Sequence, residues 1–101
     1  MEINNLFSVK NKVAVVTGGS RGIGEMITSG FLANGAKVYI TARKAPALIE
    51  KAQELSELYD AECIPFPCDL STSEGIDSFT NMIAEKEDGI DYLINNAGAA
   101  W

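Results

Sequence analysis

The sequence predicts an α/β protein of the Rossmann type, in which one parallel sheet carries helices on both faces. Residues 13–16 (Val-Ala-Val-Val) form an apolar run without polar alternation, which is typical of a strand covered on both faces. Gly18, Gly22 and Gly24 then lead into a segment with helical periodicity. Further strand-like segments, separated by helical patterns, follow at residues 37–42, 61–68 and 90–94.

The connections between these segments predict the strand order 3-2-1-4. A strand, a crossover helix and a second strand form a right-handed unit, so residues 37–42 should lie beside the first strand. Pro65 and Pro67 place residues 61–68 at an edge, because proline cannot donate to the ladder. Residues 90–94 should pair with the other side of the first strand, which creates the switch point where open α/β sheets bind ligands.

Each predicted helix carries apolar residues at helical spacing, and Asn34-Gly35 should end the first one. These residues are Ile23, Met26, Ile27, Phe31 and Leu32 in the first helix, Leu48, Ile49, Ala52, Leu55 and Leu58 in the second, and Ile76, Phe79, Met82 and Ile83 in the third. We expect the second and third sets to be core. We interpret Gly30 as a point where the helix packs closely on a strand, since glycine inside a helix is about 1 kcal/mol less stable than alanine and needs a reason. Residues 71–74 resemble a capping box.

Composition excludes several classes of function. A formal net charge of −6 argues against nucleic acid as a partner. No apolar run approaches the roughly 20 residues of a membrane span, and no secretory signal is visible, so we expect a cytoplasmic protein without membrane contacts. The chain contains no histidine, and Cys63 and Cys68 therefore predict no metal site. We interpret both as reduced, buried thiols, with a disulfide as the alternative.

The glycine-rich turn after residue 16 is suited to binding a pyrophosphate. Glycine allows φ > 0 and lets a ligand approach the main chain. The helix that begins near Ile23 presents unpaired N–H groups and the positive end of its dipole, and both favour an anion. The alternative is an ordinary glycine-rich connection between a strand and a helix.

Two motifs resemble the short-chain dehydrogenase/reductase family. Residues 17–24 (TGGSRGIG) are similar to its cofactor motif, and residues 95–98 (NNAG) to its second signature. The resemblance covers essentially the whole chain but only the first part of such a domain. We therefore expect residues 1–101 to be the N-terminal part of a single NAD(P)-binding Rossmann domain, left incomplete because no helix follows the fourth strand. Within the family, the sequence looks most like 3-oxoacyl-[acyl carrier protein] reductases, including the rhamnolipid-type ketoacyl reductase.

The resemblance implies a set of cofactor-binding residues at the carboxyl ends of the strands. They are Gly18, Ser20, Arg21, Gly22, Ile23, Gly24, Arg43, Lys44, Asp69, Leu70, Asn96, Ala97 and Gly98. In the family, the equivalent of Asp69 binds the adenine amino group, the next residue packs on the ring, and the equivalent of Asn96 ties neighbouring strands together. Ala97 and Gly98 would lie along the nicotinamide-side ribose. From the residues alone, Asp69 is equally a loop or cap residue, and Asn95 equally structural.

The end of the second strand predicts NADP(H) in preference to NAD(H). An acidic residue there would bind the ribose 2′-OH and repel a 2′-phosphate, but Ala42 occupies the position. Arg43 and Lys44 follow, and the resemblance directs Arg21 toward the same ribose. A guanidinium–phosphate bond contributes about 1.5–3 kcal/mol, which corresponds to roughly 10- to 150-fold in affinity. The alternative is that Arg43 and Lys44 are solvated loop charges.

The chain contains no predicted catalytic residue. The family uses a serine and a Tyr-x-x-x-Lys pair. None of the three tyrosines of this chain has a lysine four residues later, because those positions are Arg43, Cys63 and Asn96. We expect the full-length protein to be an oxidoreductase that transfers hydride between NADPH and a small-molecule ketone or secondary alcohol, including a 3-oxoacyl thioester, and to form homo-oligomers (a tetramer or dimer). The chain alone should be an inactive fragment. Alternatives are a non-catalytic dinucleotide-binding module and a nucleotide-sugar epimerase or dehydratase, whose TGxxGxxG spacing is absent.

Overall fold

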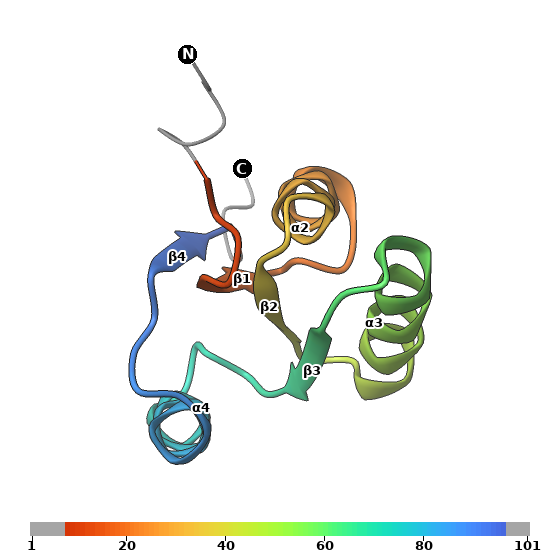
Figure 1. Cartoon of the computed structure of the whole chain (residues 1–101). Helices are drawn as coiled ribbons and strands as arrows, with labels where there is room; N and C mark the ends of the chain where they lie inside the picture. Colours follow the sequence, from red (N-terminus) through yellow and green to blue (C-terminus); the bar gives the residue numbers. More distant parts are fainter. Residues whose placement is uncertain (1–7, 97–101) are drawn as a thin grey trace.

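A computed structural model describes residues 8–96 and has the predicted architecture. Its elements are β1 (Val13–Thr17), α2 (Gly22–Ala33), β2 (Lys37–Ala42), α3 (Ala45–Tyr59), β3 (Cys63–Pro67), α4 (Ser73–Lys86) and β4 (Tyr92–Asn95). The four strands form one parallel sheet in the order β3-β2-β1-β4 (Figure 1). The predicted strand order is therefore confirmed, although β3 is shorter than residues 61–68 and β4 begins two residues later than predicted.

The centre of the sheet is covered on both faces. Helices α2 and α3 lie on one face and α4 on the other (Figure 1). Val16 and Ile40 belong to the core cluster on the side of α2 and α3, whereas Val15 and Tyr39 pack toward Ile83 of α4. The unbroken apolar runs of β1 and β2 follow from this arrangement, because successive side chains on both strands enter a core.

The predicted apolar face of helix α2 is only partly the face that packs on the sheet: Leu32 is in the core and Ile27 and Phe31 pack against it, but Ile23 and Met26 do not. Its buried residues are Gly24, Thr28 and Leu32, spaced four apart. Ile23 is 68% exposed and Met26 is 73% exposed. The small residues Gly24 and Thr28 bring the helix close to the sheet, and the larger side chains of Ile23 and Met26, which lie off their line, remain outside.

Four further expectations about helix packing are wrong within the described residues. Leu58 and Ile49 on α3 are exposed, Leu58 to 67%, because both lie off the line of Leu48, Ala52 and Leu55 that meets the sheet. Ile76 on α4 is also exposed. Gly30 does not pack closely on a strand, since a Cβ added there would meet no atom within 4 Å. The expected end of α2 is confirmed, because Gly35 has a φ of 88° after the Asn34 cap.

The start of α4 and the state of the cysteines need smaller corrections. The N-cap is Thr72, whose side chain accepts a hydrogen bond from the Gly75 N–H at 3.0 Å. Because Gly75 occupies the third helical position, no capping box forms. Both cysteines are free, as expected; Cys63 is buried, but Cys68 is only half-buried. No helix within residues 8–96 is long and apolar enough to span a membrane.

Candidate nucleotide-binding site

The turn between β1 and α2 depends on glycine for two separate physical reasons. Gly18 and Gly22 have φ angles of 66° and 60°, in the left-handed region that L-residues rarely adopt. Gly24 instead packs where no Cβ fits: a Cβ would collide with the Gly18 carbonyl oxygen and lie 2.7 Å from Asn96 Nδ2. The turn is therefore held tightly against the amino end of α2.

The second glycine of the motif is enclosed by side chains. A Cβ on Gly19 would lie 2.6 Å from Ile40 Cγ2 and 2.7 Å from Thr28 Oγ1. Thr28 is fully buried, and its hydroxyl lies 2.8 Å from the Gly24 carbonyl oxygen and 3.3 Å from the Gly19 carbonyl oxygen. The inner side of the turn is thus filled by protein atoms. A Cβ on Gly22 would meet nothing within 4 Å, so space beside the turn remains at that residue.

The end of β4 is joined to the same turn through Thr17. The Asn96 N–H donates to Thr17 Oγ1 at 2.8 Å, and Thr17 Oγ1 lies 3.1 Å from the acceptor Asn95 Oδ1. The Asn96 side chain donates to the Gly18 carbonyl oxygen at 3.4 Å. Asn96 therefore links β4 to the turn after β1, as the resemblance implied. Asn95 also has a structural contact, which agrees with the alternative considered for it.

Three exposed cations are candidates for binding a phosphate. Arg21 is the N-cap residue of α2 and makes no side-chain cap hydrogen bond, while Arg43 and Lys44 follow β2 directly. No ion pair occupies any of the three within residues 8–96. Their charges are therefore not neutralised by a carboxylate contact inside this part of the chain.

Asp69 follows β3 and is held in a turn by its own neighbours. Its Oδ1 accepts hydrogen bonds from the Ser71 N–H at 2.9 Å and the Ser71 hydroxyl at 2.6 Å. These bonds, and to a lesser degree the charge of Arg43, hold the pKa of the Asp69 carboxyl below its ordinary value. The carboxylate thus organises the loop before α4, which is the loop role that the residues alone left open; the cap of α4 is Thr72. Leu70 beside it is half-buried.

The topology brings the predicted site residues to one edge of the sheet. Residues 18–24 follow β1, Arg43 and Lys44 follow β2, Asp69 and Leu70 follow β3, and Asn96 follows β4. Because all four strands are parallel, these positions meet at the carboxyl edge. Ala97 and Gly98 lie outside the described residues.

Sequence reasoning missed Thr17, Gly19 and Thr28, whose contacts shape this turn. Gly19 stands inside the motif, and Thr28 follows Gly24 by one helical turn on the same face, so a spacing of four residues was the available signal.

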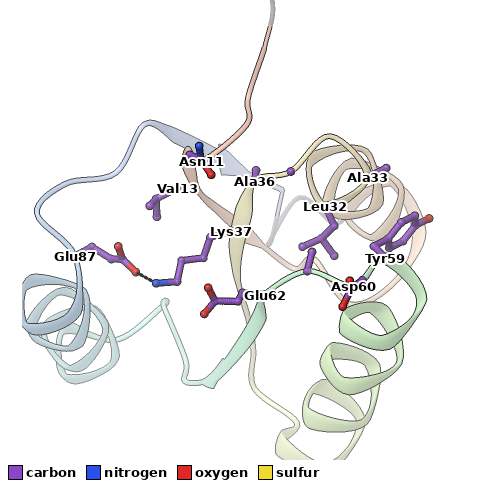
Figure 2. A pocket seen from close by; sticks show the side chains of 12 residues that line it. Asn11, Val13, Leu32, Ala33, Ala36, Lys37, Tyr59, Asp60, Glu62 and Glu87 are labelled. Carbon is purple, nitrogen blue, oxygen red and sulfur yellow. Dashed lines mark ion pairs between the residues drawn. The ribbon is translucent and has the colours of Figure 1, made fainter.

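A hollow of about 550 Å³ lies at the opposite, amino edge of the sheet. Its walls include Lys37, Glu62 and Glu87, and Lys37 Nζ contacts Glu87 Oε2 at 2.6 Å (Figure 2). Glu87 also accepts a hydrogen bond from the buried Tyr39 hydroxyl at 2.6 Å. These contacts join β2 to the end of α4 and pair the charges of Lys37 and Glu87 with each other. We therefore place the candidate site at the carboxyl edge instead. Within residues 8–96, no group of His, Cys, Asp or Glu could hold a metal ion.

The fold and the glycine turn define a Rossmann-type nucleotide-binding protein. Comparison with known families specifies it further: the model of the short chain dehydrogenase family matches residues 12–101. The chain therefore belongs to the short-chain dehydrogenase family.

Similar relatives and structures agree with this family. The rhamnolipids biosynthesis 3-oxoacyl-[acyl-carrier-protein] reductase of Pseudomonas aeruginosa is 44% identical over 95 residues, which cover 94% of this chain and 36% of the relative. The Pseudomonas aeruginosa RhlG/NADP active-site complex superposes with a TM-score of 0.86 at 44% identity, covering 93% of this chain and 37% of that one. L-Sorbose reductase of Gluconobacter frateurii, complexed with NADPH and L-sorbose, gives a TM-score of 0.86 at 37% identity, with 91% and 35% covered. The chain thus spans about a third of the length of these proteins.

Proposed function

We propose that this chain forms the cofactor-binding part of an NADP(H)-dependent oxidoreductase that acts on a ketone or a secondary alcohol. The observation that carries the proposal is the tightly packed glycine turn with three cations, Arg21, Arg43 and Lys44, at the same edge of the sheet, none of which forms an ion pair within residues 8–96. Relatives solved with NADP or NADPH support the choice of nucleotide. When bound, the nicotinamide ring supplies or accepts a hydride.

The turn would hold the pyrophosphate through its backbone. Gly22 and Ile23 begin α2, so their N–H groups belong to the unpaired amino end of that helix. A negative group there is favoured by these donors and by the helix dipole. The open space beside Gly22 fits the approach of a phosphate, which a side chain would impede. In this proposal Ser20 and Asn96 border the same site.

The charges after β2 would select the additional 2′-phosphate of NADP(H). No acidic residue stands between Ala42 and Lys44 to accept a hydrogen bond from a free ribose hydroxyl. Ala42 pairs with Pro67 in the parallel ladder of β2 and β3, so the residues that follow these two strands face a common region. In this proposal Asp69 and Leu70 contact the adenine from that region.

The proton donor of the reaction would come from elsewhere in the full-length protein. Tyr39 is 1% exposed and hydrogen-bonded to Glu87 at the amino edge. Tyr59 lies at the amino-edge hollow, and Tyr92 starts β4 at the same end. None of them can protonate an alkoxide formed at the carboxyl edge. We therefore propose that the 101-residue chain binds the nucleotide but does not turn over substrate. For the whole protein, our candidate substrate is a 3-oxoacyl thioester, after the name of a similar relative.

Cofactor titration of the protein expressed from its full reading frame tests the preference. We expect NADPH to bind roughly 10- to 150-fold more tightly than NADH. Arg43→Gln should weaken NADPH about tenfold or more and leave NADH nearly unchanged, because only NADPH carries the additional phosphate.

Lys86→Gln, which removes a cation at the far end of α4, is the matched control and should alter neither affinity. Equal affinity of the unmodified protein for both cofactors would contradict the NADP(H) assignment. Binding without any turnover of ketones or alcohols by the full-length protein would favour the non-catalytic module instead.

A further inference from the structure

We infer that Thr28 is a positioning residue for the pyrophosphate-binding turn, acting through the carbonyl group of Gly19. The inference rests on the proposed nucleotide site but concerns a residue on the inner side of α2 that would not touch the nucleotide itself. Thr28 is 0% exposed and belongs to the line of α2 that meets the sheet. A buried hydroxyl requires a partner, and its only acceptors in the hydrogen bonds of the described region are two carbonyl oxygens of the turn and its helix.

The first contact is local and the second is not. The Thr28 hydroxyl lies 2.8 Å from the Gly24 carbonyl oxygen, one helical turn before it. Side chains of threonine in helices commonly make this bond. The contact with the Gly19 carbonyl oxygen at 3.3 Å instead spans nine residues and connects the body of α2 to the turn. Since a hydroxyl has one hydrogen to donate, the Gly19 contact is the longer arm of a hydrogen bond shared with the Gly24 carbonyl. Through this arm the hydroxyl can hold the orientation of the peptide that follows Gly19.

The orientation of this peptide decides where its donor points. In a planar trans peptide the carbonyl and the following N–H point in opposite directions. Because the Gly19 carbonyl is directed inward to Thr28, the N–H of Ser20 is directed away from the core. Ser20 lies between the two left-handed residues of the turn, on the stretch proposed to hold the pyrophosphate. Thr28 would thus keep one donor aimed at the anion.

The packing around Gly19 supports this coupling. Thr28 Oγ1 and Ile40 Cγ2 leave no room for a Cβ at residue 19, as the distances of 2.7 Å and 2.6 Å show. The φ angle of Gly19 is outside the left-handed region, so space and not backbone strain requires glycine there. Thr28 and Ile40 therefore restrict residue 19 to glycine, which keeps the turn in contact with α2.

Binding of two probes to the full-length protein and its variants tests the inference. NADPH carries a pyrophosphate, whereas adenosine 2′-monophosphate carries the adenosine and 2′-phosphate without it. We expect Thr28→Val, which keeps the volume and removes the hydroxyl, to weaken NADPH binding by roughly 2- to 10-fold, the equivalent of one hydrogen bond. Binding of adenosine 2′-monophosphate should stay within about twofold of the unmodified protein, and Thr28→Ser should retain tight NADPH binding.

The controls separate positioning from folding and from the proposed function. If Thr28→Val does not fold, Thr28→Ser and Thr28→Ala are compared instead, because they differ only in the hydroxyl. Unchanged NADPH binding by Thr28→Val or Thr28→Ala, or an equal loss for both probes, would overturn the inference. Failure of the unmodified protein to bind NADPH would overturn the proposed function itself.

Discussion

At the scale of single residues, the glycines of this chain differ in what each one requires. Gly22 is needed for its positive φ, since the space beside it is open. Gly19 and Gly24 are needed for space, since a side chain would collide with neighbouring atoms. Gly30 meets neither condition: it lies in α2 with nothing within 4 Å of an added Cβ. A glycine in this sequence can therefore be required for a positive φ, required for lack of space, or not required, and the sequence alone does not distinguish these cases.

Gly24→Ala and Gly30→Ala form a matched pair within one helix. Gly24→Ala should destabilise the full-length protein by about 1–3 kcal/mol, because the new methyl group collides with the Gly18 carbonyl oxygen. Gly30→Ala should stabilise it by roughly 0.5–1 kcal/mol through the higher helix propensity of alanine. Urea denaturation measures both changes. Equal effects of the two substitutions would contradict the packing described at Gly24.

The two cysteines should differ in reactivity. Burial raises the pKa of the Cys63 thiol to about 12, and Cys63 is only 6% exposed. The pKa of Cys68 is also raised, by burial and by the charge of Asp69, but the side chain is half-buried. Since the thiolate is the reactive form, iodoacetamide at neutral pH should label Cys68 before Cys63. Mass spectrometry of the folded protein measures the order, and Cys68→Ala should leave almost no early labelling.

At the scale of elements, β2 and α4 are joined by a charged contact at the amino edge of the sheet. Glu87, which caps the carboxyl end of α4, contacts Lys37 at the start of β2 and accepts the Tyr39 hydroxyl hydrogen bond. The hydrogen bonds from Lys37 and Tyr39 lower the pKa of Glu87 below its ordinary value. The pKa of Tyr39 is raised mainly by burial and, to a lesser degree, by its hydrogen bond to Glu87. The contact fixes where α4 ends on the sheet.

This contact makes stability depend on pH in a direction that can be tested. A carboxyl whose pKa is lower in the folded state stabilises the protein above its unfolded pKa, and that contribution is lost as pH falls through the folded pKa. We therefore expect denaturant stability to decline from about pH 4.5 downward. Glu87→Gln should make the decline shallower. Glu85→Gln, on the same helix and exposed, is the control and should keep the slope of the unmodified protein.

At the scale of the whole molecule, several apolar side chains of the described region face outward. Leu93 of β4 is 64% exposed, in a strand whose pairing within residues 8–96 is with β1. Ile23 and Met26 leave a second apolar area on α2. A parallel strand normally has both faces covered. The chain also spans only about a third of the length of its relatives. Both observations support the proposal that the chain is part of a larger domain.

The isolated chain should therefore self-associate, whereas the full-length protein should not show this exposed apolar surface. Dye binding and light scattering of residues 1–101, compared with the full-length protein at equal molar concentration, measure the difference. Leu93→Lys should reduce association of the isolated chain because it places a charge on the exposed strand. A monomeric isolated chain that unfolds cooperatively would contradict the proposal.

Much of the fold could be predicted because its signals are local or topological. The apolar run of β1, the glycines after it and the prolines of β3 each restrict the backbone where they stand. The handedness of crossover connections then fixes the strand order. Only part of the packing face of α2 could be predicted in this way. Ile27, Phe31 and Leu32 pack on the core as the pattern indicated, but Ile23 and Met26 do not, because Gly24 and Thr28 occupy the part of the helix that meets the sheet.

The sequence by itself determined the class of protein, the strand order and the edge at which the candidate site residues gather, because periodicity, turn residues and crossover handedness are properties of short segments. Only the tertiary structure decided which glycines need space and which need a positive φ. It also decided that Thr28 faces Gly19 and that Asn96 reaches the turn after β1. These contacts join residues 9 and 78 positions apart, and such separations arise only when helix and strands pack together.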